Sequence, residues 1–163
     1  MTVTENPDAA ALAKAAKVAA AKAGGAKDYY GDHITVRFEL ARCLHVGVCV
    51  RSIPAVFDTK RRPWVLPDAG DAGEIAQVIR RCPSGALHYE YTDPAAQAEE
   101  GRRPATVRTA DGEPLWVEGD VVLADNGREI PETRAALCRC GSTANRPFCD
   151  ASGPCTDWRH HSH

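Results

Sequence analysis

Three cysteines in the carboxyl-terminal part of the chain have the spacing of metal ligands. Cys138 and Cys140 are separated by one residue and Cys149 follows after eight more, in a C-x-C-x8-C pattern. Residues i and i+2 of an extended strand point to the same face, so Cys138 and Cys140 can present both sulfurs to one iron or zinc ion. Residues 145–147, Asn-Arg-Pro, favour a bend that would bring Cys149 back to the same place. The pattern therefore predicts a metal site.

Residues 138–150, C-R-C-G-S-T-A-N-R-P-F-C-D, resemble the CDGSH-type iron–sulfur domain. That family has a C-x-C pair followed by P-x-C-D-G-(S/A/T)-H, and its fourth ligand is the histidine four residues after the third cysteine. Gly153 stands at that position here, and Cys155 is the nearest replacement. His160 and His161 are the alternatives to Cys155, and a structural zinc ion is the alternative to iron. The resemblance implies a 2Fe-2S cluster held by Cys138, Cys140, Cys149 and Cys155.

A second set of cysteines lies nearer the amino terminus. Cys43 and Cys49 are separated by five residues, and Cys82 follows in a Cys-Pro dipeptide. Bacterial ferredoxins have C-x2-C-x2-C with a distant Cys-Pro, so Val46 takes the place of the middle thiol. Three thiolates with an apolar residue at the fourth corner suit a 3Fe-4S cluster. Gly47 has no side chain and would let backbone N–H groups approach the cluster sulfurs.

Residues 29–91 resemble the divergent single-cluster ferredoxin domain of the 4Fe-4S mono-cluster type. The matching features are the C-x-H-x3-C run from residue 43, the Cys-Pro-Ser-Gly-Ala-Leu run from residue 82, and the short stretches Tyr30-Gly31, Val56-Phe57 and Arg62-Pro63-Trp64. A 4Fe-4S cluster would need His45, water or another external ligand at its fourth iron. The other interpretation of His45 is a loop histidine that forms a hydrogen bond near the cluster. The choice between three and four irons stays open.

Composition limits the class of protein and its surroundings. With 44% hydrophobic and 26% charged residues, the 163-residue chain has the composition of a soluble globular protein. Only 3 Phe, 3 Trp and 4 Tyr, beside 13 Gly and 11 Pro, predict small loop-rich modules that need more than a large core for stability. The odd number of cysteines, 7, favours metal ligation in a reducing compartment, hence a cytoplasmic location. The net charge of −2 predicts no nucleic-acid or membrane partner.

Hydrophobic periodicity predicts the elements that position the two cysteine sets. Around the first set we expect strands over residues 33–40, 63–67 and 86–91 and helices over residues 50–57 and 71–81. Around the second we expect an antiparallel meander with strands at 105–109, 115–117, 121–123 and near residue 130, joined by turns at 111–112, 118–120 and 125–127. Before them, an Ala/Lys-rich stretch with a marginal helix over residues 9–22 is expected to form a solvated tail.

These elements predict an α+β protein of two domains. A ferredoxin-like cluster domain would occupy residues 29–93, after a tail over residues 1–28. Residues 94–104, rich in Ala, Glu, Arg and Gly, would form a linker. A small β-rich, CDGSH-like domain would occupy residues 105–163.

The predicted function is one-electron transfer by an intracellular protein with two iron–sulfur clusters. We expect no enzyme, because the chain has no Ser-His-Asp order, Gly-rich phosphate loop or paired carboxylates with an evident role. The expected partner is a redox protein, a reductase or oxidoreductase. A basic face could dock it, with a merely solvated surface as the alternative: Lys60, Arg61, Arg62, Arg80 and Arg81. The other possible function is that of a cluster sensor or cluster-transfer protein. The other interpretation of the second domain is that it binds structural zinc.

Overall fold

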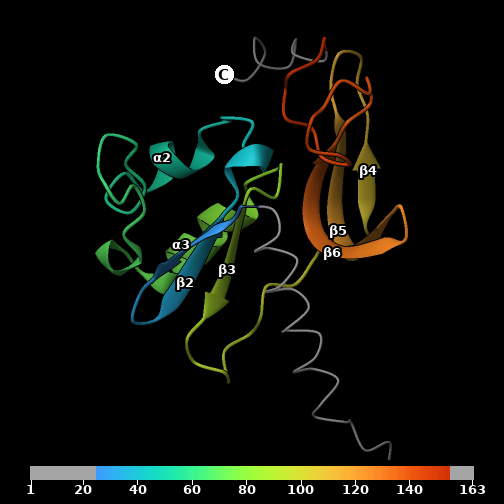
Figure 1. The fold of residues 1–163 in the computed structure, drawn as a ribbon. Coiled ribbons are helices and arrows are strands. Elements are labelled where there is room, and N and C mark those ends of the chain that lie inside the picture. The colour runs from blue at the N-terminus through green and yellow to red at the C-terminus, as the bar shows by residue number, and fades with distance from the viewer. Residues whose placement is uncertain (1–24, 155–163) are drawn as a thin grey trace, which may run out of the picture.

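The protein forms two small units, each built on a three-stranded antiparallel sheet (Figure 1). The computed structural model describes residues 25–154. The predicted tail helix over residues 9–22 and the candidate ligands Cys155, His160 and His161 lie outside these residues. In the described part of the chain, no helix has both the length and the apolar character to cross a membrane.

The sheet of the first unit follows sequence order, with β2 in the middle. Its strands are β1 (Lys27–Tyr30), β2 (Ile34–Phe38) and β3 (Leu87–Tyr91). Apolar residues alternate along β2 and β3 and give the sheet one buried face, on which Ile34, Val36 and Leu87 are almost fully enclosed. The strands predicted over residues 33–40 and 86–91 are confirmed. Strand β1 has no counterpart in the sequence-based prediction, which starts the domain at residue 29.

Helix α3 (Ala72–Arg80) covers the buried face of this sheet. Its apolar side chains at i, i+3 and i+4, Ile75, Val78 and Ile79, join the strands in one core. Asp71 caps the helix, since its carboxylate accepts a hydrogen bond of 3.0 Å from the N–H of Glu74. The helix predicted over residues 71–81 is therefore confirmed, and it ends immediately before Cys82.

Two other predictions for the first unit are wrong in extent. The helix expected over residues 50–57 is α2 (Val48–Ser52), which ends because Ile53, before Pro54, leaves helical geometry. The strand expected over residues 63–67 is reduced to one bridge between Val65 and Phe57, since prolines at both ends lack the N–H that pairing needs. Two short 3-10 turns complete the unit, Leu40–Arg42 and Pro67–Ala69.

The second unit is the predicted meander with longer strands. It consists of β4 (Thr106–Arg108), β5 (Leu115–Asp125) and β6 (Arg128–Leu137). Asn126 and Gly127, both at positive φ, form the two-residue turn between β5 and β6, as predicted. The turn predicted at residues 118–120 is wrong, because β5 continues through it with a bulge between Glu118 and Val121. Gly119 permits the bulge: a Cβ there would lie 2.6 Å from the carbonyl oxygen of Arg102.

Candidate metal centres

The cysteines of the first set lie in or close to three short helical elements. Cys43 follows the 3-10 turn Leu40–Arg42, Cys49 lies in α2, and Cys82 follows α3. The three thiols are partly buried, and none of the six described cysteines forms a disulfide. Burial, with smaller contributions from Cys82 and Cys43, raises the pKa of the Cys49 thiol to about 11. Bound metal cations would favour the thiolate form of these cysteines.

His45 lies on the solvent side of the loop that joins Cys43 to Cys49. Its φ is 56°, a left-handed value that histidine adopts more readily than most residues. Its Nδ1 is 3.8 Å from the Sγ of Cys43, which suits a weak polar contact to sulfur. The neighbouring Leu44 and Val46 are enclosed in a separate apolar cluster. The structure thus places His45 beside one cysteine of the set, as expected for a histidine near the site.

The second cysteine set begins at the end of β6. The Sγ atoms of Cys138 and Cys140 are 3.8 Å apart. Two thiolates on one tetrahedral metal, each at about 2.3 Å, have a sulfur separation of about 3.8 Å. The N–H of Gly141 donates to the Sγ of Cys138 at 3.2 Å, an interaction that stabilises a thiolate. This pair is therefore arranged as the C-x-C spacing predicts.

Cys149 returns to this pair through the predicted bend. The N–H of Phe148 donates to the carbonyl of Asn145 at 2.9 Å and closes the turn. Backbone bonds of 2.9 Å from Cys138 to Pro147 and 2.8 Å from Cys149 to Ala136 then bind the returning segment to β6. Burial raises the pKa of the buried Cys149 thiol, with smaller contributions from Cys138 and Cys140. The three cysteines of the second set therefore also lie together.

The loop continues past Cys149 with Asp150 at its centre. The Asp150 carboxylate accepts hydrogen bonds from the N–H of Ala144 at 2.9 Å and from the N–H of Ser152 at 3.0 Å. Gly153, at the position of the CDGSH histidine, approaches Cys140 so closely that a Cβ would overlap its Sγ. A side chain at residue 153 would therefore need the loop to rearrange, and the described residues contain no fourth ligand at that position.

The donor sets suit a cluster better than a single ion. Within residues 25–154, no three Cys, His, Asp or Glu side chains are placed to hold one metal ion. An iron–sulfur cluster differs in this respect, because the cysteine thiolates that hold it are distributed over two or more iron atoms. The described residues provide two sets of three thiols, and in the second set a backbone N–H group is directed at sulfur, which is the donor chemistry that such clusters require.

The two cysteine sets meet across the contact between the units. Leu44, next to Cys43, is only 2% exposed and belongs to one apolar cluster with Trp116 and Cys149 of the second unit. The guanidinium of Arg42 lies 3.9 Å from the ring centre of Phe148, the residue before Cys149. The segments that carry Cys43 and Cys149 are therefore in direct contact.

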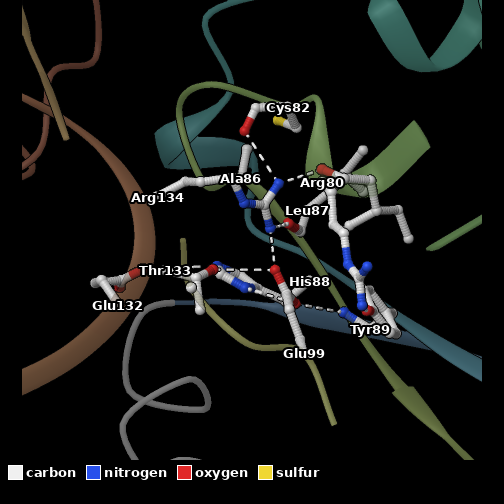
Figure 2. Close-up of polar contacts among 12 residues, drawn as sticks. Arg80, Cys82, Ala86, Leu87, His88, Tyr89, Glu99, Glu132, Thr133 and Arg134 are labelled. Atoms are coloured by element: carbon white, nitrogen blue, oxygen red, sulfur yellow. Dashed lines mark hydrogen bonds and ion pairs between the residues drawn. The ribbon is translucent and has the colours of Figure 1, made fainter. Parts of the chain in front are cut away.

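Two buried arginines join the units. Arg42 of the first unit makes two hydrogen bonds to the Glu132 carboxylate of β6, at 2.8 and 2.9 Å. Arg134 of β6 pairs with Glu99 and also donates to backbone carbonyls of the first unit, including that of Cys82 (Figure 2). The sequence-based prediction missed this network, because it treated residues 94–104 as a linker and assigned no role to Arg42 or Arg134. One available signal was the stretch Glu132-Thr133-Arg134, in which two opposite charges lie on the same face of a strand.

Comparison with known proteins identifies the class of both units. Residues 29–92 match the family model described as a divergent 4Fe-4S mono-cluster, and residues 112–152 match the one described as an iron-binding zinc finger of CDGSH type. Together with the two cysteine sets, these matches define an iron–sulfur protein.

The relatives are bacterial. The uncharacterized protein YjdI of Escherichia coli K12 is 46% identical over 68 residues, which are 42% of this chain and 90% of that protein. The same protein of Escherichia coli O157:H7 gives the same values. The chain therefore belongs to the divergent 4Fe-4S mono-cluster family, here followed by a CDGSH-type iron-binding domain. No solved structure matches the chain.

Proposed function

We propose that the protein is a one-electron carrier with two iron–sulfur clusters. The observation that carries the proposal is that each unit has its own set of three thiols without a disulfide, with the Sγ atoms of Cys138 and Cys140 3.8 Å apart in the second. An iron–sulfur cluster bound by such thiolates accepts and releases single electrons. What the chain itself supplies is the ligands, apolar side chains such as Leu44 that limit water, and N–H groups directed at sulfur.

For the first site we propose Cys43, Cys49 and Cys82 as ligands of a 4Fe-4S or 3Fe-4S cluster in a ferredoxin-like α+β unit. For the second we propose a 2Fe-2S cluster on Cys138, Cys140 and Cys149, with Cys155 as the fourth ligand. Replacing either set of three cysteines by serine should remove the signal of one cluster and leave that of the other. Loss of both signals from either variant would contradict two separate sites.

An electron-carrier role, rather than catalysis on a small substrate, is supported by the surface of the described residues. Two surface hollows of about 170 and 260 Å³ lie beside Asp68 and beside Arg81, and neither is lined by a cysteine. Pockets that hold small-molecule ligands are usually about 300–1,000 Å³. Turnover of a small substrate by the cluster-loaded protein would contradict the proposal.

We propose a redox protein with an acidic surface as the partner, in the cytoplasm. Lys60, Arg62, Arg80 and Arg81 are exposed and supply positive charge. Arg61 contributes less, because its guanidinium donates to the backbone carbonyls of Ala55 and Val56 at 3.1 and 2.9 Å. Electron exchange with such a partner should slow as salt is added, because salt screens the attraction. A rate that is independent of salt would contradict docking by this face.

Cluster transfer is the second candidate, and the exposure of the second site favours it. Cys140 and the following residues Gly141 and Ser142 are exposed, whereas all three thiols of the first site are partly buried. Mixing the oxidised holo-protein with an apo acceptor distinguishes the two functions. Rapid movement of the cluster to the acceptor, without electron exchange with any reductase, would favour transfer over electron carriage.

A further inference from the structure

The turn that carries Cys82 presents its backbone carbonyls to the second unit. Cys82 follows the last turn of α3, and its N–H donates to the carbonyl of Ile79 at 2.9 Å. The last carbonyls of a helix have no partner within the helix and need one from elsewhere. In this protein the carbonyls of Ile79 and Cys82 accept nearby backbone N–H groups and, in addition, the guanidinium of Arg134 of β6, as Figure 2 shows for Cys82.

Arg134 donates hydrogen bonds to three backbone carbonyls: that of Cys82, one before it and one after it. Its Nη1 donates to the carbonyls of Ile79 and Cys82, the latter at 3.1 Å, and its Nη2 donates to the carbonyl of Leu87 at 3.1 Å. These bonds connect the end of α3, the Cys82 turn and the start of β3. A planar guanidinium, with donors in a fixed arrangement, can hold all three at once.

The side chain of Arg134 is itself held in place. It is 4% exposed, and its guanidinium pairs with the carboxylate of Glu99, which comes from the segment between the units. Glu99 also accepts hydrogen bonds from the hydroxyl of Thr133 at 3.0 Å and from the N–H of Tyr89 at 3.2 Å. Because Glu99 balances the charge of Arg134, the effect on Cys82 comes from geometry rather than from a net positive charge.

We propose that Arg134 is a positioning residue for Cys82, so that the first cysteine site is complete only when the second unit is docked against it. The inference rests on the proposed function, in which Cys82 holds the first cluster. Its consequence is that the second unit controls how firmly the first cluster is held. A disturbance at β6 would reach the first site through the carbonyl of Cys82.

The test uses the full-length, cluster-loaded protein with Arg134→Lys. Lysine keeps the positive charge but loses the planar set of donors, so it cannot bind all three carbonyls. Arg128→Lys is the matched control, because Arg128 lies on the same strand but is exposed and pairs with Asp125 at the hairpin. The readouts are the electron paramagnetic resonance spectrum of each cluster and the rate at which a chelator removes iron from each.

We expect Arg134→Lys to change the spectrum of the first cluster and to speed its loss of iron at least about fivefold, because the carbonyls around Cys82 lose their shared side-chain donor. The second cluster serves as an internal reference and should change less. The control should match the unmodified protein at both sites. Unchanged spectra and iron loss at the first site in a folded Arg134→Lys variant would overturn the inference.

A second variant keeps the inference testable if Arg134→Lys does not fold. Glu99→Gln leaves the guanidinium in place but removes its charge partner, so the first cluster should change in the same direction by a smaller factor. An unaltered first cluster in Glu99→Gln would then overturn the inference. Absence of iron and sulfide from the unmodified protein is a different result, which contradicts the proposed function itself.

Discussion

Arg42 and Glu132, which are 90 positions apart in the chain, form a buried ion pair with two hydrogen bonds of 2.8 and 2.9 Å. Both side chains are about 5% exposed. Arg42 precedes Cys43, and Glu132 lies on the strand that leads to Cys138. The pair therefore fixes the two cysteine-bearing segments relative to each other.

Breaking this pair from one side should strongly destabilise the protein. Glu132→Leu leaves the buried Arg42 with only the longer ion pair to Glu39 at 3.7 Å, and loss of one partner of a buried pair costs about 3–5 kcal/mol. Replacing both, with Arg42→Met and Glu132→Leu, should recover much of that loss. Urea unfolding of the holo-protein measures the free energy of unfolding of the single and of the double variant. The exposed pair between Arg128 and Asp125 is the control, since Asp125→Asn should cost less than about 1 kcal/mol. Equal costs for the buried and exposed pairs would contradict this account of the contact.

Gly85 of the first unit lies against the backbone of β6. Its φ is +66°, and a Cβ there would overlap the carbonyl oxygen of Arg134. Gly85→Ala should therefore cost more than the roughly 1–2 kcal/mol of the left-handed conformation alone. Gly127→Ala is the matched control, because Gly127 has φ +79° but no atom within 4 Å of the place that a Cβ would take. The difference between the unfolding free energies of the two variants measures the cost of the overlap with β6. Equal losses would show that β6 does not contact residue 85.

Low pH should weaken the contact between the two units, because it protonates Glu99. Burial alone would raise the pKa of Glu99, but its hydrogen bond and charge interaction with His88, the charge of Arg134 and the N–H of Tyr89 outweigh burial and lower the pKa to about 2. A lowered pKa in the folded state means that the stabilisation is complete above the unfolded pKa of about 4.3 and is lost as pH falls toward 2. Glu132, which faces the other nitrogen of His88 at 3.6 Å, belongs to the same group of charges.

The measurement is the difference in unfolding free energy between the unmodified protein and Glu99→Gln at several pH values. This difference should shrink by roughly 2 kcal/mol from pH 7 to pH 3, because only the unmodified protein carries the titrating carboxyl group. Acid damage to the clusters affects both proteins and cancels in the difference. A difference that is independent of pH would show that folding does not lower the pKa of Glu99, and would contradict the stabilising role of its ion pair.

Cys155 is the proposed fourth ligand of the second cluster. Cys155→Ser should abolish the spectrum of the second cluster and leave the first intact, whereas His160→Ala and His161→Ala should leave both unchanged. A potential of the second cluster that falls by roughly 59 mV per pH unit between pH 6 and 8 would instead indicate a titrating histidine ligand. Full retention of the second cluster in Cys155→Ser would contradict the assignment of Cys155.

Local patterns were enough to predict much of this protein. Helix α3 has its cap at Asp71 and its apolar stripe within one stretch, and the turn at Asn126-Gly127 needs only its own two residues. The C-x-C pair likewise depends on the geometry of adjacent residues. Each of these features is determined within about ten residues, so the sequence alone carries the signal.

The contact between the units could not be predicted in this way. Charged residues are mostly exposed, so nothing in the sequence indicates that Arg42 and Arg134 are buried, and Glu99 falls in the predicted linker. They become buried because their partners arrive from distant parts of the chain, and neither partner is recognisable without the other. The bulge in β5 is similar, since it depends on residues 102–105 approaching Gly119. Such features require the fold before they can be recognised.

The central claim is that one chain holds two iron–sulfur clusters, and metal and sulfide analysis of anaerobically purified protein tests it most directly. Iron, acid-labile sulfide and zinc would be counted in the sample whose electron paramagnetic resonance is recorded oxidised and reduced. We predict iron and sulfide in amounts that fill both sites, two distinguishable cluster signals and no stoichiometric zinc. Zinc without sulfide at the second site, or a protein without iron, would contradict the claim.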